Sequence, residues 1–320
     1  MVYAPVAIWT LNRNEHLKRC IESLEKNSFA RNTELFISVD YPPSERYEEG
    51  YQSIKNYLAG NKFKFKKVYM FYQETNLGPV ENYNFIIREA FSKYDRIIIS
   101  EDDNEFGPYF LEYMDYMLEK YESAEDVFAI GGYSYPVQWK NDGNSVVKIN
   151  NIFSAWGSGI WREKYERCLT NLERKNVDIL MKNFKEIFRI WRYSPKAFCN
   201  LVHSYLGKGG IMCGNNGDFL PEDITLGMYL IWKKQYFIIP KTTQVINTGY
   251  DGSGVHCISN VSARERKISK CESEILINMK SDVKFEKINC RKIKRMYAVS
   301  IRDAISNWKQ YIFFRCYPNK

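Results

Sequence analysis

The sequence lacks any apolar stretch near the ~20 residues that a transmembrane helix requires. It also lacks the basic start and apolar core of a signal peptide, so we expect a cytoplasmic protein without a membrane span. Its eight cysteines show no C-x-x-C spacing, which argues against a zinc site and fits reduced thiols. The first apolar run ends at Thr10–Arg13 without the glycine-rich turn of a phosphate-binding loop.

Apolar and aromatic residues are plentiful instead. Of the 320 residues, 45% are hydrophobic and 16% aromatic, which is typical of a packed globular protein. The net charge of +8 is concentrated at the end of the chain, where residues 261–320 carry 15 basic and 6 acidic side chains. Such a segment favours an anionic partner. No nucleic-acid-binding motif accompanies the charge, so nucleic acid is not the expected partner.

The basic segment also has an apolar pattern. Between Arg291 and Lys309, Lys and Arg alternate with isoleucine and aromatic residues, and the pattern predicts helix over much of 291–313. Such a helix either lies on an anionic membrane or packs on the rest of the chain with its charges solvated. We therefore treat 261–320 as a basic, partly helical extension with a possible peripheral membrane contact.

The first 125 residues alternate strand and helix patterns. Short apolar runs separated by amphipathic helical stretches occur at Pro5–Leu11, Glu34–Asp40, Lys67–Tyr72 and Arg96–Ser100. This alternation predicts an α/β fold with a mostly parallel central sheet flanked by helices. In such sheets ligands bind at the carboxyl ends of the strands. We expect residues 1–125 to form the first half of this fold and residues 126–260 the second half, with Trp156–Trp161 as a glycine-containing aromatic loop.

Three consecutive carboxylates, Glu101, Asp102 and Asp103, follow the apolar run Arg96–Ser100. Adjacent carboxylates repel one another, and a divalent cation relieves that repulsion. Oxygen ligands suit Mg²⁺ or Mn²⁺ bound jointly with phosphate oxygens. The alternative is that these residues only begin the helix near Pro108, where acidic groups are favourable.

Four segments in order along the chain resemble those of a known family. Arg96–Asp103 with Phe106 and Pro108 looks like the metal-site segment of GT-A glycosyltransferases. It is most similar to the EDD form of the DXD motif in the inverting N-acetylglucosaminyltransferase I family, and bacterial family 2 enzymes share parts of the pattern. The other matching segments are Ala155–Trp161, Pro221-Glu222-Asp223 and Gly254-Val255-His256.

The resemblance implies roles for individual residues of the donor site. Asp103 would ligate the metal that bridges the donor's phosphates, with His256 as a second ligand or only a structural hydrogen-bonding group. Asp102 would bind the ribose, and Glu101 the ribose or the transferred sugar. Two further residues, Thr10 and Arg13, would line the nucleotide pocket. Asp40 would accept from a uracil N–H, unless it only begins the turn before Pro42.

The resemblance also implies that residues 1–125 bind the nucleotide-sugar and that residues 126–260 form the acceptor-binding, catalytic half. Asp223 would be the general base that inverting transfer requires, with Glu222 as substitute, although Asp223 also stands where a residue capping the following helix would be. Trp156 and Trp161, on either side of Gly157, would stack on sugar rings or belong to the core. We therefore expect a metal-dependent, inverting transferase. It would move GlcNAc or another hexose or HexNAc from a UDP-sugar to a glycan or lipid-linked glycan, in bacterial surface polysaccharide synthesis at the inner face of the plasma membrane.

Two other classes share parts of this pattern. A sugar-1-phosphate nucleotidylyltransferase has a similar sheet and acidic residues but opens with a glycine-rich phosphate loop. A non-catalytic nucleotide- or carbohydrate-binding protein would keep the pocket without needing Asp223.

Overall fold

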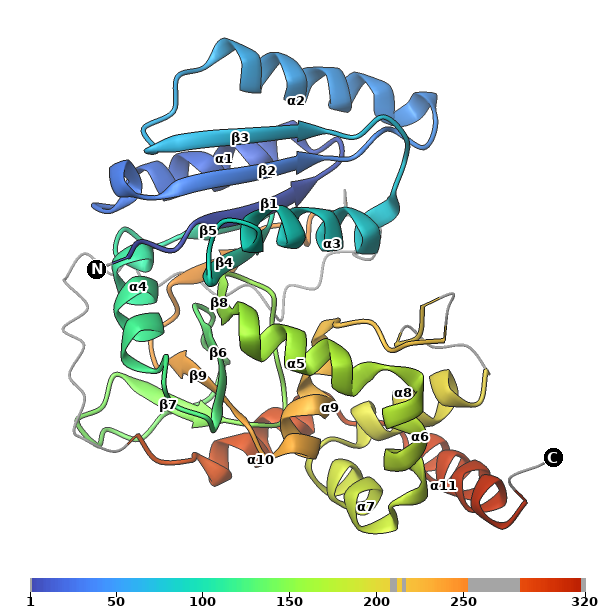
Figure 1. Cartoon of the computed structure of the whole chain (residues 1–320). Coiled ribbons are helices and arrows are strands. Elements are labelled where there is room, and N and C mark those ends of the chain that lie inside the picture. Colours follow the sequence, from blue (N-terminus) through green and yellow to red (C-terminus); the bar gives the residue numbers. More distant parts are fainter. Residues whose placement is uncertain (1, 208–211, 215–216, 253–282, 318–320) are drawn as a thin grey trace.

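The computed structural model describes residues 2–207, 212–214, 217–252 and 283–317 (Figure 1). One eight-stranded sheet runs through it in the order β3-β2-β1-β4-β8-β6-β9-β7. Its strands are β1 (Val6–Thr10), β2 (Glu34–Val39), β3 (Lys67–Tyr72), β4 (Arg96–Glu101), β6 (Val127–Gly131), β7 (Val146–Ile149), β8 (Ser158–Trp161) and β9 (Tyr236–Pro240). The predicted nucleotide-binding and catalytic parts of the chain thus share a single sheet.

Most of this sheet is parallel, as predicted. Strands β3, β2, β1 and β4 form a parallel block, and β6 and β9 continue in the same direction. Strand β8 is antiparallel to both of its neighbours, and β7 is antiparallel to β9. The expected loop over Trp156–Trp161 is therefore wrong in its second half, because Ser158–Trp161 is an inner strand of the sheet. The reversal of β8 places its first residues beside the carboxyl ends of β4 and β6.

Helices cover both faces of the sheet, in agreement with the predicted α/β class. One face packs against α1 (Asn14–Glu25), α2 (Glu48–Gly60) and α4 (Phe110–Lys120). The apolar spacing Leu17, Cys20, Ile21 and Leu24 places all four side chains of α1 on that face, fully buried. The other face packs against α3 (Gly78–Phe91), α5 (Arg162–Leu172), α6 (Arg174–Lys182), α7 (Phe184–Tyr193), α8 (Pro195–Tyr205) and α9 (Asp223–Lys233).

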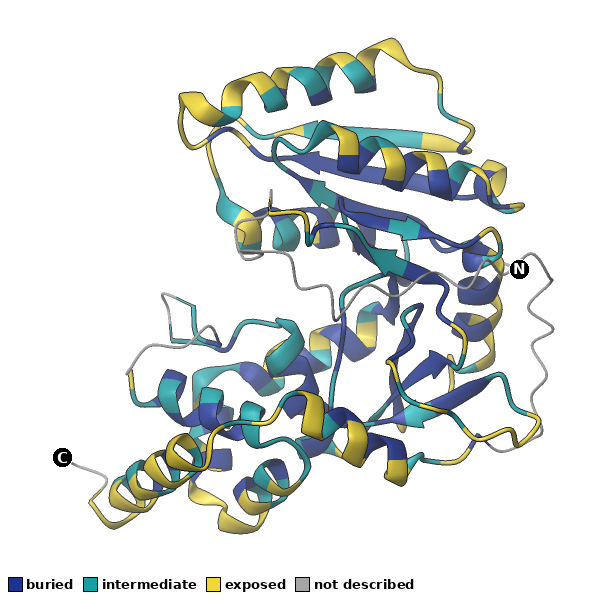
Figure 2. Ribbon diagram, turned by 180° about the vertical axis from the view of Figure 1, so that it is seen from behind, coloured by how far each residue is buried: buried dark blue, intermediate teal, exposed yellow. Residues whose placement is uncertain are grey.

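The strands alternate their side chains between these two cores. Ile97 and Ile99 of β4 belong to the core under α3, whereas Ile98 belongs to the core under α1 and α4. Figure 2 shows the buried strands between helices whose outer sides are exposed. The region 162–206 contains four helices, and the side chains of Asn183 and Ser194 cap the starts of the last two.

A second, two-stranded sheet lies next to the acidic segment. It pairs β5 (Asn104–Phe106) antiparallel with β10 (Val245–Asn247). The pairing opposes Asn247 to Asn104, which is the residue directly after the three carboxylates. Residues 247–250 are thereby brought from the end of the described catalytic half to the edge of the main sheet.

The extension is helical as predicted, but as two helices instead of one continuous stretch. Helix α10 (Lys287–Met296) and helix α11 (Ile301–Cys316) are separated at residues 297–300, where Ser300 accepts from Asp303 N and starts the new helix. One side of α11 packs on α8 and α7, with Tyr311 fully buried and Trp308 against Phe198. Within the described part of the chain, no helix has the length and apolar character to cross a membrane.

Candidate active site

The acidic segment after β4 is held by two side chains from the end of β1. Because β1 and β4 are parallel neighbours, their carboxyl ends lie side by side. The Thr10 hydroxyl donates to Asp102 Oδ2 at 2.6 Å. The Arg13 guanidinium bonds Asp102 and also lies 2.9 Å from Asp103 Oδ2. Four residues that the sequence assigned to one site are therefore in direct contact.

Negative charge accumulates at this edge. Burial is the main cause that raises the pKa of Glu101 well above its ordinary value, and repulsion from Asp103, Asp223 and Asp102 raises it further. Burial also raises the pKa of Asp102, although the charge of Arg13 offsets part of the effect. Burial disfavours the charged form of Arg13, but the negative charges of Asp102 and Asp103 have the larger effect and raise the pKa of Arg13. Further positive charge would stabilise the ionised carboxylates here.

Asp103 is also held by the segment that follows β10. Asn247 Nδ2 donates to Asp103 Oδ1, and the Thr248 N–H and hydroxyl donate to the Asp103 carbonyl at 2.8 and 3.0 Å. A Cβ on Gly249 would lie only 2.0 Å from Asp103 Oδ2, so glycine is required for this close approach. Sequence reasoning missed these three residues, whose only local signal is the polar run Asn-Thr-Gly after a short strand.

The site is suited to a divalent cation held jointly with a phosphate-bearing donor. No three His, Cys, Asp or Glu side chains of the described residues come together as a complete metal cage. Mg²⁺-like cations in phosphate sites need only one or two carboxylates, because substrate phosphates supply the other oxygens. Asp103, within a buried excess of carboxylates, fits that requirement. The other predicted ligand, His256, lies outside the described residues.

Asp40 lies at the carboxyl end of β2, buried, with both carboxylate oxygens engaged. Oδ1 accepts from the N–H groups of Tyr41 and Leu77, and Oδ2 accepts from Gly78 N and the Asn76 amide. Asp40 therefore holds the turn that leads into α3. This is a structural role, like the alternative in which Asp40 only begins the turn before Pro42. A uracil N–H would have to share an oxygen that already accepts two hydrogen bonds.

Asp223 is the first residue of α9 and lies within electrostatic reach of Glu101. The Asp223 Oδ1 atom accepts a hydrogen bond from the Ala155 N–H at 2.9 Å. This bond connects the start of α9 to the segment that precedes β8. Burial raises its pKa to about 7, against the lowering effect of the Ala155 bond. The preceding Glu222 occupies the capping position of α9 and adds to the repulsion.

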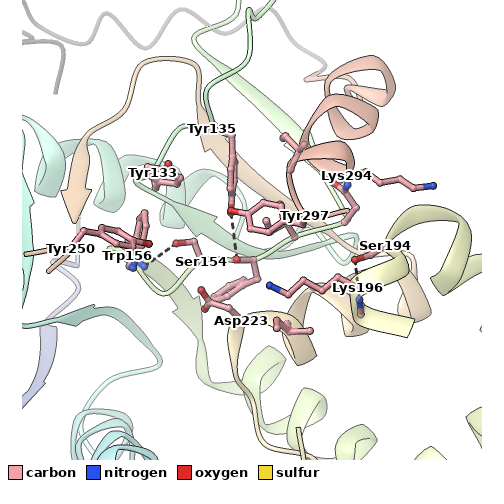
Figure 3. Close-up of a pocket in the computed structure, with 17 residues that line it drawn as sticks. Tyr133, Tyr135, Ser154, Trp156, Ser194, Lys196, Asp223, Tyr250, Lys294 and Tyr297 are labelled. Atoms are coloured by element: carbon pink, nitrogen blue, oxygen red, sulfur yellow. Dashed lines mark hydrogen bonds between the residues drawn. The ribbon is translucent and has the colours of Figure 1, made fainter. Parts of the chain in front are cut away.

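A cavity of about 220 Å³ opens beside Asp223. Trp156 lines it, with its ring 4.8 Å from the Tyr133 ring and 6.1 Å from the Tyr250 ring. Figure 3 shows these three aromatic side chains together on one side of the cavity, with Asp223 and Lys196 below Tyr297. Aromatic faces next to a carboxylate are suited to a ligand with both apolar faces and hydroxyl groups, such as a sugar. The expectation for Trp156 is thus compatible with its position.

Two expected substrate-binding residues lie elsewhere. Trp161 is 4% exposed and pairs with Arg96 at the amino end of β4, the end away from Glu101. Its ring packs in the core with the Lys164 ammonium 3.9 Å from the ring centroid. The expectation that Trp161 stacks on a sugar is therefore wrong. Gly157 has φ +61° and packs against Phe106 and Phe110, so its role is in the backbone rather than toward substrate.

The fold and this site, a mostly parallel sheet with carboxylates at its carboxyl edge beside a cavity that holds a candidate base, are those expected of a GT-A glycosyltransferase. Residues 6–190, more than half of the chain, match the profile of Glycosyl transferase family 2. The chain belongs to this family, and the sequence-based expectation of a glycosyltransferase is confirmed. No curated protein matches the chain.

Several solved structures resemble parts of the chain. The mannosyltransferase PcManGT from Pyrobaculum calidifontis, in complex with GDP-Man and Mn²⁺, is 14% identical over 52% of this chain and 46% of its own, with a TM-score of 0.40. Residues 1–349 of S. aureus TarS are 14% identical over 52% and 49%, with a TM-score of 0.37. The same part of TarS in complex with UDP-GlcNAc is 17% identical over 45% and 38%, with a TM-score of 0.32. The chain thus spans less than half of the length of each.

Proposed function

We propose that this family 2 member is an inverting, metal-dependent enzyme. It transfers GlcNAc or another hexose or HexNAc from a UDP-sugar to a hydroxyl of a glycan or lipid-linked glycan. The observation that carries the proposal is the placement of Asp223, with a pKa of about 7, between the cavity and the acidic edge. An inverting transfer requires one base on the acceptor side and a binding site for a diphosphate on the donor side.

In this reaction the acceptor oxygen bonds to the anomeric carbon of the donor sugar as that carbon's bond to the diphosphate oxygen breaks. Asp223 takes the proton of the acceptor hydroxyl, and UDP leaves with the electron pair. The raised pKa suits this role, because a base that titrates near the working pH is both ionised and basic enough. Glu222 would be the substitute base.

On the donor side, Thr10 and Arg13 would line the nucleotide pocket with Asp40, and Asp102 and Glu101 would bind the ribose or sugar. Mn²⁺ or Mg²⁺ held by Asp103 would supply positive charge to the departing diphosphate. The support for this assignment is the buried excess of carboxylates and their contacts. His256 remains a proposed second ligand.

We place the enzyme in bacterial surface polysaccharide synthesis, at the cytoplasmic face of the plasma membrane. The membrane contact is supported by the outward side of α11, where Ile301, Ile305 and Ile312 are 80%, 52% and 53% exposed beside basic residues. Basic residues around an apolar helix face favour contact with an anionic bilayer.

A donor panel tests the proposed function. UDP-, GDP-, CMP- and dTDP-sugars are incubated with the enzyme and Mn²⁺ or EDTA, and the released nucleotide is measured. We expect slow hydrolysis of one UDP-sugar that EDTA stops and that Asp103→Ala reduces by at least a hundredfold. Folded enzyme that binds no donor with metal present would overturn the proposal.

A glycine substitution tests the proposed metal position with little chemical change. In Gly249→Ala the new methyl group must displace the Asp103 carboxylate, so Mn²⁺-dependent binding of the donor should fall at least tenfold, as measured by calorimetry. Gly60→Ala is the matched control, because a Cβ there meets no atom within 4 Å. Equal donor affinity in the two variants would remove Asp103 from the metal site.

A further inference from the structure

Helix α10, from the basic extension, forms a wall of the cavity that holds Asp223. Ile293, Lys294 and Tyr297 line that cavity together with Asp223. The helix is fixed in place: Asn151 Nδ2 donates to the Cys290 carbonyl at 2.9 Å, and Ile293 is fully buried. The extension is therefore part of the acceptor side of the site.

A second cavity, of about 280 Å³, lies directly beyond this wall. It shares Asn151 and Lys294 with the first cavity, so the two are neighbours. Tyr193 and Cys290 also line it. Its remaining lining is entirely basic: Arg192, Lys287, Arg291, Lys294 and Arg295.

Four of these residues, Arg192, Lys287, Arg291 and Arg295, are exposed, and Lys294 Nζ donates to the Arg192 carbonyl at 2.5 Å. Among the described residues, no carboxylate forms an ion pair with any of the five. The nearby Glu286 accepts from the Ile288 N–H at the start of α10. Burial, together with Arg192 and Arg291, lowers the pKa of Lys294. An anion bound here would relieve this repulsion.

From this juxtaposition we propose that the second cavity binds a phosphate or diphosphate group of the acceptor, while the acceptor's sugar occupies the first cavity next to Asp223. Five cations exceed what a single carboxylate needs, and guanidinium groups pair with phosphate oxygens in a bidentate way. Lys196, which lines the first cavity, adds another cation along the same path. The inference rests on the proposed function, since it names the acceptor class of that same site.

Binding of inorganic pyrophosphate is the first test, in EDTA so that no metal can hold it at the donor site. We expect pyrophosphate to raise the unfolding temperature of the wild-type enzyme and of the control Lys62→Ala/Lys64→Ala, which removes two cations far from the cavity along the chain. The variant Arg291→Ala/Arg295→Ala should lose the shift. An unchanged shift in this variant, or no shift in the wild type, would overturn the proposal.

Transfer to paired acceptors is the second test. Monosaccharide 1-phosphates are compared with the corresponding methyl glycosides, and the ratio of their KM values is measured. In the wild type, we expect the phosphate group to lower KM at least tenfold relative to the methyl glycoside. In Arg291→Ala/Arg295→Ala this preference should be lost. The KM for the methyl glycoside, measured with the same protein, is the internal reference. A methyl glycoside used as well as its phosphate would overturn the proposal.

Two further arms identify the source of the phosphate and separate the two proposals. A water-soluble alkyl diphosphate glycoside is compared with a polyprenyl diphosphate glycoside in vesicles, and preference for the second assigns the group to a lipid carrier. Hydrolysis of the UDP-sugar without any acceptor tests the proposed function by itself. If hydrolysis occurs but phosphate confers no preference, only the acceptor inference fails.

Discussion

Asp223 owes its properties to its immediate surroundings. Burial raises its pKa to about 7, while the Ala155 N–H fixes one oxygen of the carboxylate and opposes the shift. The carboxylate is thus oriented by the backbone that precedes β8 and lines the cavity. A buried, oriented carboxylate that titrates near neutrality is what proton removal from a sugar hydroxyl requires.

The pH dependence of transfer follows from this pKa. Only the ionised form of Asp223 accepts a proton, so kcat should rise about tenfold per pH unit below pH 7 and level off above it. Asp223→Asn should lower kcat by about 10²- to 10⁴-fold above pH 7, where the wild-type carboxylate is ionised, and by progressively less below pH 7, because the amide is not basic at any pH. Transfer is measured by product formation between pH 5 and 9 with saturating donor.

Asp223→Glu serves as the control, since it keeps the carboxylate but moves it by one methylene group. It should retain a pH-dependent rate above that of the asparagine variant. A profile in Asp223→Asn that matches the wild type would assign the proton to another group, with Glu222 the first to examine.

Local patterns predicted where the three acidic residues lie in the fold. Glu101, Asp102 and Asp103 follow an apolar strand, so their position at a sheet edge was predictable. The approach of Gly249 to Asp103 was not, because it depends on a pairing between β5 and β10 across more than a hundred residues. The core position of Trp161 was also missed, because strand pairing decides burial and a local aromatic pattern does not.

At the scale of elements, one lysine joins the end of α4 to the start of β6. Lys164 Nζ donates to the carbonyls of Tyr121, Ala124 and Val127 at 3.2, 2.9 and 2.8 Å. Burial lowers its pKa to about 8. The ammonium thus satisfies carbonyls that the end of α4 and the following turn leave without helical partners.

Removing this ammonium should weaken the junction. Lys164→Met removes one donor from three carbonyls, although those of Tyr121 and Ala124 keep a backbone N–H donor. We expect a loss of about 1–3 kcal/mol in the free energy of unfolding, measured with urea. Lys175→Met is the control, because its ammonium is exposed and pairs at the surface with Glu173, so the free energy of unfolding should change far less than in Lys164→Met. Equal losses in both variants would contradict the role of Lys164.

The helices and strands of the first half were predictable because the apolar residues in each follow the spacing of a helix or form a short strand-like run. Strand β8 was assigned to a loop, since Ser158–Trp161 is short and contains a glycine that its neighbours in the sheet accommodate. The break between α10 and α11 carried a signal that was overlooked. Ser300 and Asp303 form the reciprocal capping pattern that starts a helix, with the Ser300 hydroxyl donating to Asp303 Oδ2 at 2.7 Å.

At the scale of the whole molecule, α11 has two unlike sides. Asn307 and Tyr311 are buried against the catalytic part, while Ile305, Ile312 and Phe313 are more than half exposed. In Figure 2 the outward side of this helix lies at the periphery, next to the described end of the chain. The sequence left open whether the extension packs or contacts a membrane, and α11 packs on one side while keeping an apolar surface on the other.

Vesicle binding tests the exposed side. The wild type should sediment with vesicles of phosphatidylcholine and phosphatidylglycerol but not with phosphatidylcholine alone, and high salt should weaken the binding. Ile305→Glu/Ile312→Glu should reduce the bound fraction at least tenfold without lowering stability, because both side chains are already exposed. Ile179→Glu, at an exposed site on α6, is the control. Equal binding by all three proteins would refute the membrane contact.

The place of α10 next to Asp223 also bears on how the enzyme is made. A ribosome delivers the acidic edge, up to Asp103, long before it delivers the base Asp223 or the wall at Lys287–Met296. Asp103 itself acquires its Asn247 and Thr248 partners only late in synthesis. A nascent chain therefore has the carboxylates of the proposed donor site but neither the proposed base nor the proposed acceptor wall, and we expect it not to transfer sugar before its own synthesis nears the end.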